Sequence, residues 1–246
     1  MISFIIPAYN EELELPSTIA AIKNAVGDEQ PHEIIVVDDA STDATAQIAS
    51  DAGVRVVSVN CRQIAAVRNA GAHAAKGNIL LFVDADTRIN ARHVSLAQAA
   101  LNAGYAGGSA RVLAHGPVPR WGRIFLRIFS VIYFGANLGA GAFLFTTRKN
   151  FDAVGGFDQE LFVGEEVFFT LALRKIGRFK ILDEPIVTSG RKLRMYSARE
   201  IFGKMFTVII GGKRVARSRA KLDIWYNGRR ETKSAFADPL QTDGSQ

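Results

Sequence analysis

The chain has 246 residues, of which 48% are hydrophobic and 22% are charged, a composition that excludes collagen-like, low-complexity and wholly disordered proteins. Its formal net charge is +6, but the charge is unevenly distributed. Residues 191–230 hold twelve Lys or Arg and two acids, so this segment carries +10 and leaves the rest of the chain at −4.

Four short apolar runs alternate with helical patterns over the first third of the chain. The runs are rich in Ile and Val and occupy residues 2–6, 34–37, 54–59 and 79–83. Strands covered on both faces have this composition. The alternation predicts an α/β domain with a parallel sheet and right-handed crossovers, in which ligands bind beyond the carboxyl ends of the strands.

Three helices are expected between these strands. Apolar residues recur on one helix face from Leu15 to Val26, and Gly27 follows as a C-cap. Ser41, Thr42 and Asp43 are N-cap candidates for a short helix that ends near Gly53. The third helix is expected over residues 62–76.

An uncharged stretch at residues 128–147 has the length of a membrane span. It contains Asn137 and several glycines, and Arg123 and Arg127 precede it. We therefore favour a helix over 121–134 followed by a buried strand over 142–146. The N-terminus lacks the basic region of a secretory signal, so we expect a cytoplasmic protein.

Several common ligand sites can be excluded on motif grounds. No Gly-x-Gly-x-x-Gly follows the first strand, and no P-loop motif occurs. Histidine and cysteine are too few for a structural zinc site, and the single Cys61 has no convincing base partner.

Acidic residues follow two of the predicted strands. Asp84 and Asp86 come directly after the fourth strand, and two carboxylates at this spacing can converge on Mg²⁺ or Mn²⁺. The alternative is a solvated turn. Asp39, after the second strand, can accept hydrogen bonds from a base or a ribose hydroxyl, or it can cap a helix. Arg68 on the third helix is either a phosphate or carboxylate partner or a surface charge.

Two further acids, Glu165 and Glu166, precede an apolar segment with a basic end and a stop at Gly177. This pattern predicts a helix with both acids at its N-terminus. They serve either as favourable charges on the helix dipole or as a general base.

Five segments in order resemble the family 2 inverting glycosyltransferases with a GT-A fold. They are residues 4–11, 36–43, 68–71, 82–86 and 155–158, the last preceding residues 164–166. The resemblance covers about residues 2–190. It implies a GT-A fold, with a Rossmann-like, mostly parallel sheet flanked by helices and followed by a basic C-terminal helical segment. It also implies a nucleotide-diphosphate sugar donor, a hydroxyl acceptor and Mn²⁺ or Mg²⁺ as cofactor.

The resemblance also implies roles for single residues. Pro7, Tyr9, Glu11 and Asp39 would line the nucleoside pocket, with Arg68 and Ala85 in the same donor site. Asp84 would contact ribose or metal, and Asp86 would ligate the cation. The family commonly has Glu-Asp where this chain has Glu165-Glu166, so Glu166 is expected to be the base and Glu165 is the alternative.

The C-terminal part resembles a Thr-Ser-x-Arg-Arg segment of some small bacterial members. Arg191 and Arg194 would close over the diphosphate, or they are ordinary surface charges. The Gln-x-x-Arg-Trp motif of processive synthases is absent, which favours single transfers. We expect a catalytic domain over 1–190 and a basic segment over 191–246 that ends in a frayed tail from about residue 235.

Residues 201–210 are apolar with one Lys and are flanked by basic residues. They either lie on an anionic membrane surface, which would suit a lipid-linked acceptor and a peripheral location on the cytoplasmic face, or pack on the core. Two alternative functions stay open. One is a catalytically inactive nucleotide-sugar-binding module. The other is nucleic-acid binding through the basic tail, which we do not expect because no such motif occurs.

Overall fold

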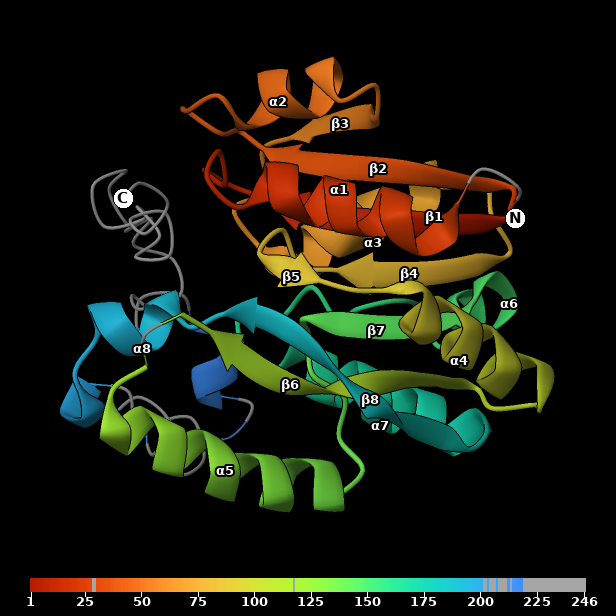
Figure 1. The fold of residues 1–246 in the computed structure, drawn as a ribbon. Helices are drawn as coiled ribbons and strands as arrows, with labels where there is room; N and C mark the ends of the chain where they lie inside the picture. The colour runs from red at the N-terminus through yellow and green to blue at the C-terminus, as the bar shows by residue number, and fades with distance from the viewer. Residues whose placement is uncertain are drawn as a thin grey trace, which may run out of the picture.

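A computed structural model describes residues 1–27, 30–116 and 118–200, together with 203, 207, 212 and 214–218. These residues form one eight-stranded sheet in the order β3-β2-β1-β4-β7-β6-β8-β5 (Figure 1). The strands are β1 (Ile2–Ala8), β2 (His32–Asp39), β3 (Arg55–Val59), β4 (Ile79–Val83), β5 (Thr87–Arg88), β6 (Gly107–His115), β7 (Phe143–Thr147) and β8 (Phe179–Ser189).

The parallel half of the sheet matches the predicted apolar runs. Strand β1 lies between β2 and β4, and both pairings are parallel, with Phe4 opposite Ile34 on one side and Leu81 on the other. Every residue of β1 is buried. Hydrophobic clusters cover both faces of β1, β2 and β4, which explains the continuous apolar runs in these strands. The edge strand β3 differs from the expectation, since it contains Arg55 and Ser58 and has no buried residue.

The other half of the sheet is mixed. Strand β7 runs antiparallel to β4 and β6, and β5 runs antiparallel to β8, whereas β6 and β8 are parallel. Four of the seven pairings are thus parallel, so the expected mostly parallel α/β sheet is confirmed. The sequence analysis did not predict β5, β6 or β8.

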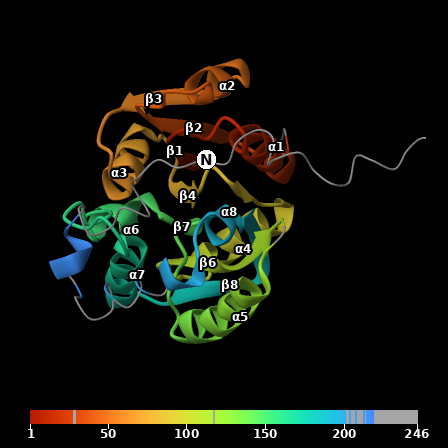
Figure 2. The same cartoon turned by 90° about the vertical axis from the view of Figure 1, so that its left-hand side faces the viewer.

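Helices lie on both faces of the sheet (Figures 1 and 2). They are α1 (Leu15–Val26), α2 (Thr45–Asp51), α3 (Ile64–Ala74), α4 (Ala91–Asn102), α5 (Arg120–Gly135), α6 (Arg148–Ala153), α7 (Glu165–Ile176) and α8 (Arg191–Met195). The expected cap at Gly27 is confirmed, with a φ of 67° that favours glycine. Helices α4 and α6 were not predicted, whereas α8 lies at the start of the expected basic C-terminal helical segment.

The start of α2 differs from the expectation. None of the three N-cap candidates occupies the cap, which is Ala44. The Asp43 carboxylate instead accepts hydrogen bonds from the Thr45 amide at 3.0 Å and from the Glu12 amide at 3.2 Å. These bonds tie the turn before α2 to the loop after β1, because both segments leave the same edge of the sheet.

The uncharged stretch at 128–147 does form two pieces, as predicted. Its first part belongs to α5 and its second to β7, with a turn between them. Within the described ranges, no helix combines the length and the apolar character that a membrane crossing requires. Most of segment 201–210 and all of 235–246 lie outside the described residues, so the predictions made for them stay predictions.

Candidate donor-binding site

A cavity of about 330 Å³ opens beyond the carboxyl ends of β1, β2 and β4. All of the predicted site residues except Arg194 line it. They come from the last residues of the strands and the loops that follow them, from α3, from the start of α7 and from the start of α8. These residues are Pro7, Tyr9, Glu11, Asp39, Arg68, Asp84, Ala85, Asp86, Glu165, Glu166 and Arg191.

Arg68 is the buried cation on one side of the cavity. Its Nη1 donates to Glu165 Oε1 at 2.6 Å, and its Nη2 donates to Asp84 Oδ1 at 2.9 Å and to the Gly141 carbonyl at 3.0 Å. Burial lowers the pKa of Arg68, but the charges of Asp84 and Glu165 raise it more, so the net shift is upward. Arg68 is therefore a structural charge that fixes two acids of the cavity, and not a surface charge.

Glu165 and Glu166 stand at the first turn of α7, as predicted, after Gly164 with a φ of 74°. Burial and the adjacent charge of Glu165 raise the pKa of Glu166 to about 8, although Arg68 opposes the shift. A carboxyl group with such a pKa exchanges its proton near neutral pH, as a general base must.

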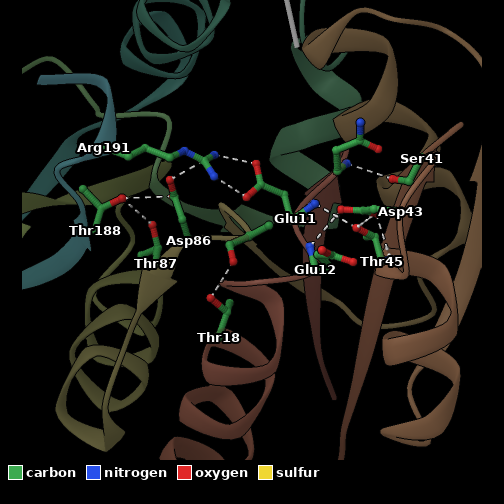
Figure 3. A network of polar contacts seen from close by, with 12 residues as sticks. Glu11, Glu12, Thr18, Ser41, Asp43, Thr45, Asp86, Thr87, Thr188 and Arg191 are labelled. Atoms are coloured by element: carbon green, nitrogen blue, oxygen red, sulfur yellow. Dashed lines mark hydrogen bonds and ion pairs between the residues drawn. The ribbon is translucent and has the colours of Figure 1, made fainter. Parts of the chain in front are cut away.

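Arg191 bridges two acids on the other side of the cavity (Figure 3). Its Nη1 and Nη2 donate to the two carboxylate oxygens of Glu11 at 2.6 and 2.5 Å, and Nη2 lies 3.4 Å from Asp86 Oδ2. Burial lowers the pKa of Arg191, but the Glu11 bond and the Asp86 charge raise it more. A planar guanidinium with this two-pronged contact is suited to phosphate as well as to carboxylate.

Asp86 is held from its other side by β8. Thr188 Oγ1 donates to Asp86 Oδ1 at 3.1 Å (Figure 3). The Ser189 amide donates to the Asp86 carbonyl at 3.2 Å. Helix α1 fixes the middle of the motif, since Thr18 Oγ1 donates to the Ala85 carbonyl at 2.7 Å. The motif after β4 is thus positioned by β8 and α1, and also by Arg68 of α3 and Arg191 of α8.

The opposite end of the cavity has an aromatic wall. The guanidinium carbon of Arg62 lies 3.5 Å from the centre of the Tyr9 ring. Asp39 Oδ1 accepts hydrogen bonds from the Cys61 and Arg62 amides at 2.7 and 3.0 Å, which hold the loop after β3 in place. Asp39 therefore shapes the loop as well as lining the cavity.

The carboxylates fit a hard divalent cation shared with a ligand. Asp84 and Asp86 offer only oxygen donors, at one rim of the cavity. Over the described part of the chain, no group of three or more His, Cys, Asp or Glu could hold a metal ion by itself. Two carboxylates plus phosphate oxygens is a common arrangement for Mg²⁺ and Mn²⁺.

Sequence reasoning missed several residues of this site. Arg62 was treated only as the start of a helix, yet it stacks on Tyr9 and has a φ of 50°, outside helical geometry. Gly141 contributes a carbonyl, and an added Cβ there would meet Arg68 Nη2 at 2.9 Å. No local motif signals either contact.

Arg194 was expected to close over the diphosphate together with Arg191. It does not line the cavity, and its Nη1 donates to the His115 carbonyl at 3.4 Å.

Comparison with known sequences places residues 3–156 in the family described as Glycosyl transferase family 2. An undecaprenyl-phosphate 4-deoxy-4-formamido-L-arabinose transferase from Aeromonas hydrophila is 36% identical over 95 residues, which are 35% of this chain and 29% of the relative. A poly(ribitol-phosphate) beta-glucosyltransferase from Bacillus spizizenii is 36% identical over 95 residues, 36% of this chain and 15% of the relative. The matches thus span less than a third of these longer relatives.

Solved structures share the fold over most of the chain. TarS residues 1–349 from S. aureus, in complex with UDP-GlcNAc, matches with a TM-score of 0.62 at 22% identity, over 92% of this chain and 71% of that one. Glucosyl-3-phosphoglycerate synthase from Mycobacterium tuberculosis, with Mn²⁺, UDP and glucosyl-3-phosphoglycerate, also reaches 0.62, at 20% identity over 88% and 79%. Since its family profile covers more than half of the sequence and its fold agrees, the chain belongs to glycosyl transferase family 2 and has the GT-A fold.

Proposed function

We propose that this chain transfers one sugar, with inversion, from a nucleotide-diphosphate sugar to an acceptor hydroxyl. The observation that carries the proposal is the cavity itself. It gathers acids from the ends of three strands, a paired Arg191 and the first turn of α7 around one space. Solved relatives hold UDP or UDP-GlcNAc, which supports a nucleotide-sugar donor here.

The donor would lie along the cavity from Tyr9 to Arg191. Pro7, Tyr9 and Asp39 would contact the nucleoside, with Arg62 stacked behind the Tyr9 ring. Arg191 would exchange its bond with Glu11 for the diphosphate, because both are anionic partners of suitable geometry.

Asp86 and Asp84 would hold Mn²⁺ or Mg²⁺ beside the diphosphate. The cation, when bound, neutralises charge that develops on the departing nucleotide. The Mn²⁺ and UDP in the solved mycobacterial synthase support this cofactor. Within this chain, Thr188 holds the Asp86 carboxylate so that it faces the cavity rim.

Glu166 would deprotonate the acceptor hydroxyl, which attacks the anomeric carbon from the side opposite the leaving nucleotide. The C–O bond to the acceptor forms as the bond to the diphosphate oxygen breaks, and Glu166 keeps the proton. Glu165 is the weaker candidate, since its carboxylate is buried and engaged by Arg68 at 2.6 Å. This carboxylate would have to break its ion pair with a buried guanidinium to take up the proton.

A lipid-linked acceptor at the cytoplasmic face of the membrane is the finer part of the proposal. Its support is that a relative from Aeromonas hydrophila is named for undecaprenyl phosphate, a lipid. The division into a catalytic domain over 1–190 and a basic segment over 191–246 belongs to the same proposal, although Arg191 already contributes to the cavity.

The test is nucleotide release from a panel of UDP- and GDP-sugars in the presence of Mn²⁺. We expect turnover with at least one donor, and its loss on chelation and in Asp86→Ala. Activity that survives both changes would exclude the metal role. Donor binding without turnover over broad donor and acceptor panels would instead identify an inactive binding module.

A further inference from the structure

The outward face of α5 is the largest gathering of exposed apolar side chains in the described part of the chain. Ile124, Ile128, Val131 and Ile132 are 62%, 56%, 72% and 67% exposed. Large apolar residues that are exposed singly are ordinary, but a contiguous group on one helix marks a contact surface.

Basic side chains flank this apolar face. Arg120, Arg123 and Arg127 are exposed on the same helix, and α5 contains no Asp or Glu. At 3.6 residues per turn, the three arginines fall on one side of the exposed face and the isoleucines and valine on the other. A helix that presents an apolar strip beside a row of arginines has the composition of an interfacial membrane helix.

From this arrangement we infer that α5 is a membrane-docking helix that lies on a bilayer containing anionic lipid. The alternative occupant, a second copy of this chain, is disfavoured by charge. A two-fold contact through α5 would bring together two helices that each carry three arginines and no acid to pair with them. An anionic bilayer accepts both the apolar strip and the positive charge.

The position of α5 ties this surface to the candidate site. The helix lies along one edge of the molecule, with its N-terminal end below α8 (Figure 1). At that end, a Cβ added to Gly122 would lie 3.6 Å from Leu193 Cδ1 of α8, the helix that begins at Arg191. At the other end, the Tyr133 hydroxyl donates to the Gly139 carbonyl at 2.9 Å, two residues before the Gly141 that binds Arg68. A bilayer under α5 would therefore lie beside the donor cavity.

The inference goes beyond the proposed sugar transfer and is tested without any substrate. The full chain is mixed with phosphatidylglycerol–phosphatidylcholine vesicles at low salt, and the bound fraction is measured by co-sedimentation. We expect binding that weakens with added salt and is much weaker on pure phosphatidylcholine. Ile128→Ser with Val131→Ser should lower the partition coefficient about tenfold or more. Arg123→Gln with Arg127→Gln should lower it about fivefold for each charge removed.

A matched control sits on α7. Lys175 and Ile176 are exposed at its C-terminal end, so Lys175→Gln with Ile176→Ser removes the same kinds of group from another surface and should leave binding unchanged. A wild-type chain that ignores anionic vesicles overturns the inference. So do α5 variants that bind like the wild type, which would move the contact to another segment. The oligomeric state of the wild type and of the α5 variants is measured by light scattering. If the wild type is a dimer and the α5 variants are monomers with unchanged vesicle binding, the inference is also overturned, because α5 would then contact a second copy of the chain.

Discussion

Glu165 and Glu166 are neighbours in the chain, but their surroundings give them different properties. Glu165 is buried and ion-paired with Arg68, whereas Glu166 is half-buried, and its partial desolvation and the nearby charge of Glu165 raise its pKa. The sequence predicted the pair and its place on α7, because the acids precede a regular helical pattern. It did not predict which acid titrates near neutral pH, since that depends on Arg68, 97 residues away from Glu165.

The pH dependence of the reaction should follow the ionisation of Glu166. If Glu166 is the base, it must be ionised to accept the acceptor proton, so kcat/KM should rise with pH, reach half of its plateau near pH 8 and level off about one unit above that. The Glu166→Asp variant should keep a similar rise with a lower plateau, and Glu166→Gln should lose the activity. A profile that is already flat at pH 6 would contradict the assignment.

Stability should respond to the same group in the opposite direction. The folded pKa of Glu166 lies above its unfolded value, so its contribution to stability is fully present below about pH 4.5 and is lost as pH rises through about 8. Glu166→Gln avoids this loss. Its melting temperature should match the wild type near pH 5 and exceed it near pH 9, by about 2–4 °C for each kcal/mol gained.

Glu165→Gln is the matched variant for that experiment. It removes a partner of the buried Arg68 guanidinium, so it should destabilise the fold, by about 3 kcal/mol, at both pH values. Differential scanning calorimetry on the two variants separates the roles. If the two variants show the same change in melting temperature at both pH values, the different roles assigned to these two acids are contradicted.

Among the helices and strands, those with one regular pattern of apolar residues could be predicted from the sequence. Strands β1, β2 and β4 were visible because both of their faces are buried and their sequences are continuously apolar. Strand β6 was not visible, since it begins with Gly107 and Gly108 and its later residues alternate in exposure. An added Cβ at Gly108 would lie 2.2 Å from Phe145 Cζ of β7, so this strand is specified by a neighbour distant in sequence.

Helix α3 offers a test of how packing positions the site. An added Cβ at Gly71 would lie 2.4 Å from Ile5 Cγ2 and 2.8 Å from Val37 Cγ2, so Gly71→Ala must push α3 away from β1 and β2. We expect a destabilisation of about 1–3 kcal/mol and reduced activity, because Arg68 lies on the same helix. A Cβ added at Gly135, at the end of α5, has no atom within 4 Å. Gly135→Ala should therefore leave the activity unchanged and the stability unchanged or slightly higher. Thermal melts and initial rates of the two variants make the comparison.

The short helix α8 begins at Arg191, which ties it to the loop after β1. Arg191 makes a two-pronged contact with Glu11 over a separation of 180 residues, which no local pattern reveals. Because the same fork suits a diphosphate, Arg191→Ala should raise the KM for the donor about tenfold or more. Arg191→Lys should recover little of this loss, since an ammonium group cannot make the paired contact. A donor KM unchanged in Arg191→Ala would exclude the diphosphate role.

At the scale of the whole molecule, the site depends on segments that span nearly the entire described chain. Tyr9 and Arg191 line one cavity although they are far apart in sequence, and both halves of the sheet contribute to its rim. The sequence predicted most of these residues one by one, through strand ends and a family resemblance. Their mutual contacts, above all Arg68 with Glu165 and Asp84 and Arg191 with Glu11 and Asp86, required the fold.

A ligand that bridges so many segments should stabilise the molecule as a unit. A donor that binds only the folded chain adds about 2.7 kcal/mol at a concentration of 100 Kd, which corresponds to a rise in melting temperature of about 5–10 °C. We expect this rise for a UDP- or GDP-sugar with Mn²⁺, a smaller one for the donor with a chelator, and none from the metal in Asp86→Ala. Thr188→Val should give an intermediate metal-dependent rise in melting temperature. It removes the hydroxyl that holds Asp86 Oδ1 but keeps the carboxylate, so it should lower the metal-dependent part of the shift without abolishing it. A donor shift that is equal with and without metal in the wild type would show that the diphosphate is bound by Arg191 and its neighbours alone.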